Sequence, residues 1–138
     1  MNYNHYLKLA GDCAKNASYK GPSRVKLGCI AVYHGTILAK CWNSDKTHTD
    51  QHKYNYLRFN EKQRYCPSKI HAEIDCISKI KYLDIDFSKV TLFIYREFST
   101  GNPAPARSCP SCLAAIREMG IKTIVYTTDN GYASEYLK

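Results

Sequence analysis

Residues 27–32 read LGCIAV, an apolar run in which no polar residue alternates with the apolar ones. A strand with one face in solvent alternates the two kinds of residue, whereas a strand covered on both faces is continuously apolar. The run therefore predicts a central strand with packed layers on both sides. Residues 26–33 and 37–42 flank a short turn that contains His34 and Gly35, which is typical of a β-hairpin.

Periodic patterns predict the other regular elements. Apolar residues recur at three- and four-residue steps over residues 3–17 and 70–82, which predicts two helices, and a third helix is expected over residues 109–119. Residues 90–95 and 121–127 are rich in β-branched and aromatic side chains, so each is expected to form a strand.

The remaining segments are expected to be loops, except for the C-terminal tail. Residues 43–69 and 96–108 are irregular, and the tail over residues 128–138 is expected to form one more short helix. Strands that alternate with helices form parallel pairs. The expected fold class is therefore α/β, a three-layer α/β/α arrangement around a central mixed sheet of four to five strands, in a single domain over residues 1–138.

Charge and cysteine usage restrict the class of protein. The net charge of +8, from 20 Lys and Arg against 12 Asp and Glu, favours anionic partners such as phosphorylated nucleotides or nucleic acid, although a merely solvated basic surface explains it equally well. No apolar run reaches the length of a membrane span, and the first residues lack the pattern of a secretory signal, so a cytoplasmic location without membrane contact is expected. The odd count of seven cysteines favours free thiols and a metal site over a disulfide framework.

Two helix starts carry reactive side chains. The sequence is HAE at residues 71–73 and CPSC at residues 109–112. Cysteines at positions i and i+3 of a helical turn can share one metal ion, and the positive end of a helix favours the thiolate form that binds it. Two thiolates leave a tetrahedral zinc site two ligands short. His71 is the candidate third ligand, and three protein ligands with one water form the arrangement of a catalytic zinc.

Glu73 is then the candidate proton carrier. Zinc lowers the pKa of a bound water towards about 7, and a carboxylate beside the metal can take and return the proton. Each motif alone also has a plain interpretation: the cysteine pair could be a redox pair, half a zinc knuckle or core, and a His-x-Glu sequence occurs by chance. Their joint appearance at two helix starts is much more specific and favours a metal site.

These two motifs resemble the signature of the zinc-dependent cytidine and deoxycytidylate deaminase superfamily, which is His-x-Glu followed by Pro-Cys-x-x-Cys. The resemblance extends from the hairpin to Val125. It implies that His71, Cys109 and Cys112 bind the zinc ion. It also implies that Glu73 is the catalytic proton shuttle, which protonates the ring nitrogen and helps ammonia to leave.

The resemblance also implies three substrate-binding residues. Asn43 matches an asparagine that holds the substrate near its sugar, and Ala72 matches a residue whose backbone contacts the base. Ser108 stands where the family has a proline before the first cysteine, and Pro110 lies inside the cysteine pair instead. The exchange leaves the ligand spacing intact but affects the loop shape and the choice of substrate, so Ser108 is counted with the substrate-binding residues.

The segment over residues 44–69 interleaves basic and aromatic residues, a pattern that suits stacking on bases and neutralising phosphates as well as a solvated loop over the site. Within it, His48, His52 and Cys66 could hold a second, structural zinc ion, although a pair of exposed histidines is the commoner interpretation.

The sequence and the resemblance together predict a zinc-dependent hydrolase that converts cytosine to uracil and ammonia. The favoured substrate is a free nucleotide such as dCMP. One alternative is a deaminase that acts on cytosine or adenine in single-stranded DNA or RNA, and another is a non-catalytic, zinc-stabilised binding module. Assembly into a homo-oligomer is a further expectation that the superfamily suggests.

Overall fold

The computed structural model describes residues 2–17, 26–44, 71–97 and 102–138. In chain order its elements are α1 (Tyr3–Ala14), β1 (Lys26–Tyr33), β2 (Thr36–Trp42), α3 (Ala72–Ile80), the 3-10 helix η2 (Phe87–Lys89), β3 (Val90–Glu97), β4 (Pro103–Ala104), α4 (Pro110–Met119), β5 (Thr123–Thr128) and β6 (Gly131–Tyr136). Every helix and strand expected before residue 128 is present, with bounds that differ by a few residues.

The strands form one mixed sheet. Its order is β2-β1-β3-β5-β6, and the short strand β4 pairs with β3. Among the described pairs only β3 and β5 run parallel, and the other pairs are antiparallel. The expectation that strands alternating with helices run parallel agrees with this sheet: β3 and β5, on either side of α4, are paired in parallel, and β2 and β3, on either side of α3, run in the same direction with β1 between them. The antiparallel pairs arise from the hairpins β1–β2 and β5–β6, from β1 lying between β2 and β3, and from β4 returning beside β3.

The C-terminal tail corrects the sequence-based expectation. It forms β6, an edge strand antiparallel to β5, and not a helix, so the sheet has six strands instead of four to five. A signal for this strand is present in the sequence: Asn130 and Gly131 follow β5, and Asn-Gly is a strong indicator of a hairpin turn. Gly131 has a φ of 142°, which a residue with a side chain rarely adopts.

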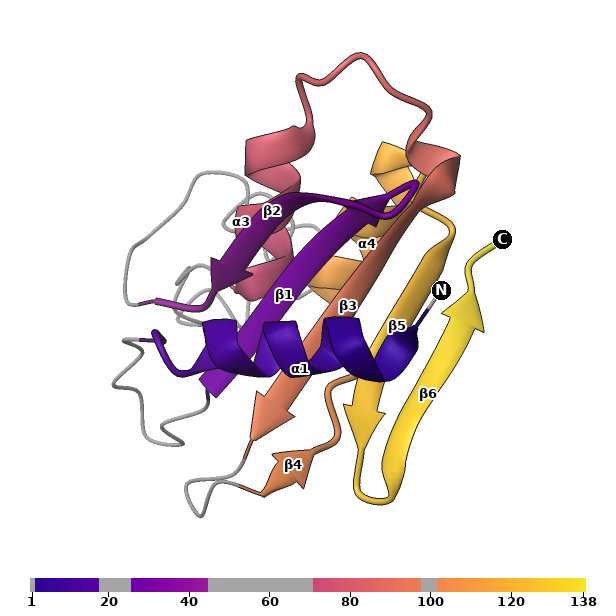
Figure 1. The fold of residues 1–138 in the computed structure, drawn as a ribbon. Coiled ribbons are helices and arrows are strands. Elements are labelled where there is room, and N and C mark those ends of the chain that lie inside the picture. Colours follow the sequence, from indigo (N-terminus) through magenta and orange to yellow (C-terminus); the bar gives the residue numbers. More distant parts are fainter. Residues whose placement is uncertain (1, 18–25, 45–70, 98–101) are drawn as a thin grey trace, which may run out of the picture.

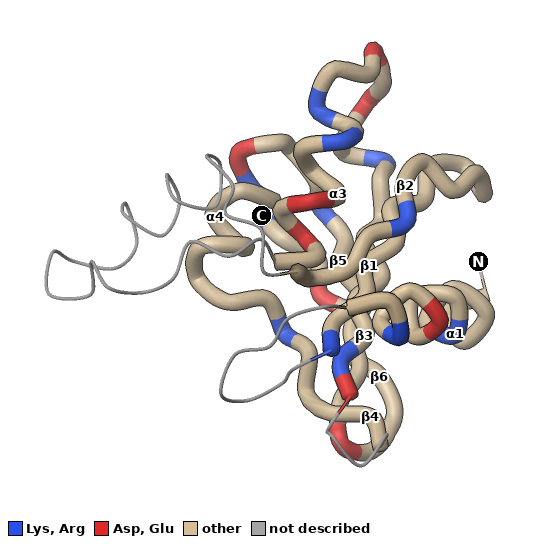
Figure 2. Tube along the Cα trace, turned by 90° about the vertical axis from the view of Figure 1, so that its left-hand side faces the viewer, with Lys and Arg blue, Asp and Glu red and all other residues tan. Residues whose placement is uncertain are grey.

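Helices cover both faces of the sheet (Figure 1). α1 crosses one face of the sheet over β1 and β3, while α3 and α4 lie together on the other face. In the view turned by 90°, the sheet lies between α1 on one side and α3 and α4 on the other (Figure 2). This is the predicted three-layer α/β/α arrangement.

Strand β1 contributes side chains to the hydrophobic cores on both faces of the sheet, as its apolar sequence predicts. Ile30 and Val32 pack on the α1 side, whereas Cys29 and Ala31 pack on the side of α3 and α4. All four are fully buried. The predicted hairpin between β1 and β2 is also confirmed, and its two turn residues, His34 and Gly35, have the positive φ angles of 50° and 78° that a tight hairpin turn requires.

None of the helices in the described ranges is long and apolar enough to cross a membrane.

Candidate metal centre and active site

The two helix starts predicted to carry the chemistry lie side by side on one face of the sheet. His71 is the N-cap residue of α3, with an extended backbone at φ −83° and ψ 156°. The carbonyl of His71 accepts the first hydrogen bond of the helix from the amide of Asp75, at 3.0 Å. Because the backbone of His71 is extended and not helical, its side chain and that of Glu73 can face the same site although they are two residues apart.

The cysteine pair uses the start of α4 in the same way. Cys109 is the N-cap residue, at φ −67° and ψ 166°, and Pro110 opens the helix. Cys112 occupies the third helical position. An N-cap side chain turns back over the third residue of its helix, which is how a capping box is formed. The two sulfurs therefore converge, and Pro110 supplies the fixed backbone angle that suits a first helical position.

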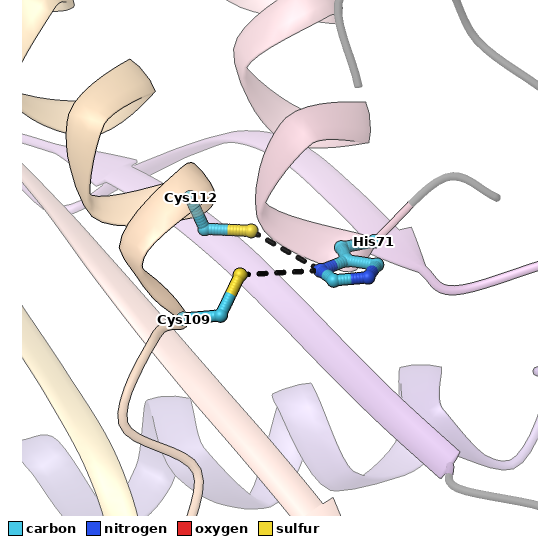
Figure 3. Close-up of side chains that lie close together, drawn as sticks. All are labelled: His71, Cys109 and Cys112. Atoms are coloured by element: carbon cyan, nitrogen blue, oxygen red, sulfur yellow. Dashed lines mark hydrogen bonds between the residues drawn. The ribbon is translucent and has the colours of Figure 1, made fainter. Parts of the chain in front are cut away.

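The His71 imidazole at the start of α3 lies close to the sulfur atoms of Cys109 and Cys112 at the start of α4 (Figure 3). His71 Nδ1 lies 3.3 Å from Cys112 Sγ and 3.7 Å from Cys109 Sγ. The three donor atoms all lie within 4.8 Å of one another. With Zn–S and Zn–N distances of about 2.3 and 2.1 Å, the ligands of a tetrahedral zinc ion lie about 3.6 Å apart. The donor set and its spacing therefore fit a zinc ion.

The electrostatics of the cluster favour a thiolate at Cys109. The pKa of this thiol is lowered to about 4, because the Cys112 side chain and the His71 imidazole donate hydrogen bonds to the sulfur and outweigh the effect of burial. The same contact between the two sulfurs, together with burial, raises the pKa of Cys112. A thiolate is the form of cysteine that binds a metal ion.

Glu73 lies beside the cluster and is only 3% exposed. Burial raises the pKa of its carboxyl, and the nearby His71 acts in the opposite direction. Its Oε2 atom accepts a hydrogen bond of 2.9 Å from the Ser108 hydroxyl. Its Oε1 atom is buried and has no partner among the described residues. A buried carboxylate oxygen without a partner is costly in a purely structural role, so this atom is available to a ligand or a water.

A cavity opens onto these groups. Among the described residues it is lined by Leu27, His71, Glu73, Arg96, Pro105, Ala106, Arg107 and Cys109. Arg96 belongs to the end of β3 and Arg107 follows β4, whereas the sequence predicted a loop over residues 96–108 that contains both. The Arg107 guanidinium is held by the Glu135 carboxylate at 2.7 and 3.1 Å, whereas the Arg96 guanidinium contacts the carbonyl oxygen of Pro105 at 3.3 Å.

The other predicted site residues have the following places. Ala72 is the first residue of α3 and is fully buried beside His71. Asn43 follows β2 and is 4% exposed, and its Oδ1 atom accepts a hydrogen bond of 2.9 Å from the amide of Leu27, a cavity residue. Asn43, Ala72 and Ser108 are not among the described residues that line the cavity, and Asn43 is linked to it only through Leu27. The proposed second zinc ligands His48, His52 and Cys66 lie outside the described residues, as does most of the basic aromatic segment over residues 44–69.

The hydrogen bonds that fix the loop preceding Cys109 were not predicted from the sequence. Thr127 in β5 is bonded twice to this loop: its carbonyl accepts from the amide of Ala106 at 2.9 Å, and its hydroxyl donates to the carbonyl of Ala104 at 2.7 Å. Glu135 in β6 binds Arg107 and also accepts a hydrogen bond of 2.7 Å from the Tyr126 hydroxyl. No local pattern predicts these contacts, because they join the loop to β5 and β6, which come later in the chain.

Solved structures of deaminases have the same fold. A dCMP deaminase from the cyanophage S-TIM5 superposes with a TM-score of 0.62 at 24% identity, over 91% of this chain and 82% of that chain. Its complex with dCMP and dUMP gives a TM-score of 0.57 at 23% identity, over 89% and 78%. A cytidine deaminase from Burkholderia pseudomallei gives 0.67 at 14% identity, over 99% and 93%. At these identities the likeness establishes the cytidine deaminase fold.

A comparison with curated protein sequences found no match. The family model described as the cytidine and deoxycytidylate deaminase zinc-binding region, in contrast, matches residues 1–128. This range includes both motifs, the hairpin and the strand β5. Because the match extends over almost the whole chain, the protein belongs to the cytidine and deoxycytidylate deaminase family.

Proposed function

We propose that the protein is a zinc-dependent hydrolase that deaminates cytosine in a free nucleotide such as dCMP, giving the uracil nucleotide and ammonia. His71, Cys109 and Cys112 hold the zinc ion in this proposal. The observation that carries it is the convergence of these three donors next to a buried carboxylate, Glu73, one oxygen of which has no partner among the described residues. A purely structural zinc site does not need such a group.

The proposed roles follow from the placement of each side chain. A zinc ion bound by the cluster would lower the pKa of a water towards about 7 and so supply a hydroxide nucleophile. Glu73 would hold a proton at Oε1, deliver it to the ring nitrogen of the base and later help to protonate the departing amine. Its burial, which raises the pKa of the carboxyl, suits a group that must hold a proton part of the time.

The neighbouring residues bind the substrate. Ala72, with its backbone beside His71, contacts the base, and Asn43 holds the sugar side of the cavity. The loop that contains Ser108 shapes the opposite wall. The dCMP deaminase of cyanophage S-TIM5, whose complex contains dCMP and dUMP, supports a cytosine nucleotide as the substrate.

The preference for a mononucleotide is supported by the charges near the cavity. Arg96 lines the cavity together with Glu73, and a guanidinium is well suited to bind a phosphate. The described part of the chain has 12 Lys and Arg against 9 Asp and Glu, and Figure 2 shows the two kinds interspersed along it. Within the described residues, these charges support a small anionic substrate bound by an individual arginine; the other 8 Lys and Arg and 3 Asp and Glu lie outside the described residues.

The test is a panel of ammonia-release assays on zinc-loaded protein. It compares cytidine, deoxycytidine, their monophosphates, adenosine, and single-stranded DNA and RNA, with the Glu73→Ala protein as the blank. We expect the highest kcat/KM with a cytosine monophosphate, and no ammonia above background with Glu73→Ala although zinc remains bound. Glu73→Gln, which preserves the size of the side chain, should be equally inactive.

Two outcomes would contradict the proposal. Deamination retained by Glu73→Ala would remove the role of Glu73, and the absence of turnover on every substrate would favour a non-catalytic zinc-stabilised module. A polynucleotide deaminase would be recognised by a steep loss of affinity as the salt concentration rises, because the counterions of the phosphates are released on binding. A mononucleotide deaminase should show a far weaker dependence on salt.

A further inference from the structure

The side chains of Ser108 and Glu73 form a buried hydrogen bond between two segments that are 35 residues apart in the chain. The donor–acceptor distance is 2.9 Å, and the two residues are 4% and 3% exposed. The family signature has a proline at the position of Ser108, and a proline has no side-chain donor. The departure from the signature therefore adds a contact to the carboxylate of Glu73.

We propose that Ser108 is a positioning residue that orients the carboxylate of Glu73 for proton transfer and does not itself bind the substrate. This inference rests on the proposed function. A glutamate side chain has several rotatable bonds, so its two oxygens are interchangeable unless one of them is held. The Ser108 hydroxyl holds Oε2, which leaves Oε1 as the oxygen without a partner among the described groups. Proton transfer then always involves the same atom, in the same place.

Ser108 is itself placed firmly enough to do this. The loop that precedes it is bonded to β5 through Ala106 and Thr127, at 2.9 Å between the amide and the carbonyl. The neighbouring Arg107 is bound by both carboxylate oxygens of Glu135 in β6. A bidentate pair of this kind restricts orientation as well as distance. The two residues that precede Ser108 are therefore bonded to β5 and β6, which holds the serine hydroxyl in place.

The position of Ser108 favours a role in orienting Glu73 over a role in binding the substrate. Its hydroxyl proton is donated to Glu73 within the buried interior, and Ser108 is not among the described residues that line the cavity. A residue that binds the substrate affects KM, whereas a residue that only orients the proton carrier affects kcat. The two roles are thus distinguishable by kinetics.

The experiment compares Ser108→Ala and Ser108→Thr with the unaltered zinc-loaded protein on the best substrate of the panel. A small displacement of a catalytic group strongly lowers the reaction rate. Ser108→Ala is therefore expected to lower kcat by about tenfold or more while KM changes by less than about twofold. Ser108→Thr keeps the hydroxyl and should recover most of kcat. Ser78→Ala, which removes a hydroxyl bonded to the Asp75 carbonyl on the outer part of α3, is the matched control and should leave both constants unchanged.

An unchanged kcat in Ser108→Ala, or a rise in KM at constant kcat, would overturn the inference. A crystal structure of the zinc-loaded wild type provides a second readout that depends neither on turnover nor on the stability of a variant, and a structure of Ser108→Ala extends it. The wild type must show Ser108 Oγ within hydrogen-bonding distance of Glu73, and the carboxylate must move or become less ordered in the variant. If the wild type deaminates nothing, the proposed function fails, but these structures still decide whether Ser108 orients Glu73.

Discussion

His71 Nδ1 lies 3.3 Å from Cys112 Sγ, although the two residues are 41 positions apart in the chain. Each residue is held at the start of a helix, and α3 and α4 pack against each other on the same face of the sheet. A metal ion bound between them would therefore link the two helices through their N-termini, and its removal should affect both the site and the stability of this side of the molecule.

Replacing Cys109 or Cys112 by serine should remove the metal. A hydroxyl is a poor ligand for zinc in place of a thiolate, and metal binding contributes to folding free energy when the ligands come from different elements. We expect elemental mass spectrometry to find a zinc content close to zero. The midpoint of thermal unfolding should also be lower than that of the wild type. Cys13→Ser is the matched control, because Cys13 is buried on the α1 side. Loss of zinc in this control as well would point to general unfolding instead of a loss of ligands.

Arg96→Gln should weaken the binding of a phosphorylated substrate selectively. Removing a charge-assisted hydrogen bond costs about 1.5–3 kcal/mol, so KM for a cytosine monophosphate is expected to rise about tenfold or more. KM for the corresponding nucleoside, which has no phosphate, and kcat should change little. Arg117→Gln on α4 is the control, because Arg117 is not among the described residues of this cavity. An equal effect on nucleoside and nucleotide would show that Arg96 does not bind the phosphate.

Glu135→Gln should lower stability by an amount that depends on pH. The Arg107 guanidinium, followed by the Tyr126 hydroxyl, holds the pKa of the Glu135 carboxyl below its usual value. A lowered pKa stabilises the folded state above the unfolded pKa of about 4.3, and this contribution is lost as the pH falls through the folded value. Because the ion pair is largely exposed, the expected loss at pH 7 is about 1 kcal/mol or less.

Urea unfolding of wild type and Glu135→Gln, measured in parallel from neutral to acidic pH, tests this expectation. The difference between the two free energies of unfolding should shrink as the carboxylate of the wild type is protonated. Asp84→Asn, which removes the same charge from an exposed position, should not show the effect. A difference that stays constant with pH would mean that the Arg107–Glu135 pair does not contribute through its charge.

Gly28→Ala should destabilise the protein through the packing of α1 on β1. A Cβ atom at this position would clash with the carbonyl oxygen of Ala10 and lie 2.7 Å from the amide nitrogen of Ala14. Backbone atoms of a packed helix cannot move aside as a flexible side chain can, so the expected cost is about 1–3 kcal/mol in the free energy of unfolding. A substitution that leaves the urea midpoint unchanged would show that α1 is not packed closely on β1.

The sequence predicted most of the elements because the patterns that specify them are local. The apolar run of β1 indicated burial on two faces, and the structure places Ile30 and Cys29 on opposite sides of the sheet. The tail was misjudged for a physical reason: β6 is an edge strand whose stability comes from pairing with β5. Its residues alone have no clear period, and only the Asn130–Gly131 pair at the end of the turn indicated a hairpin.

The sequence by itself determined which groups of the candidate site are available, because helix starts, a His-x-Glu motif and a Cys-x-x-Cys motif are all written within a few consecutive residues. Only the tertiary structure decided which of these groups meet. The contact of His71 with the two sulfurs, the bond from Ser108 to Glu73 and the position of Arg96 at the cavity all join segments that are distant in the chain. Such contacts depend on how helices and strands pack on one another, which no local pattern specifies.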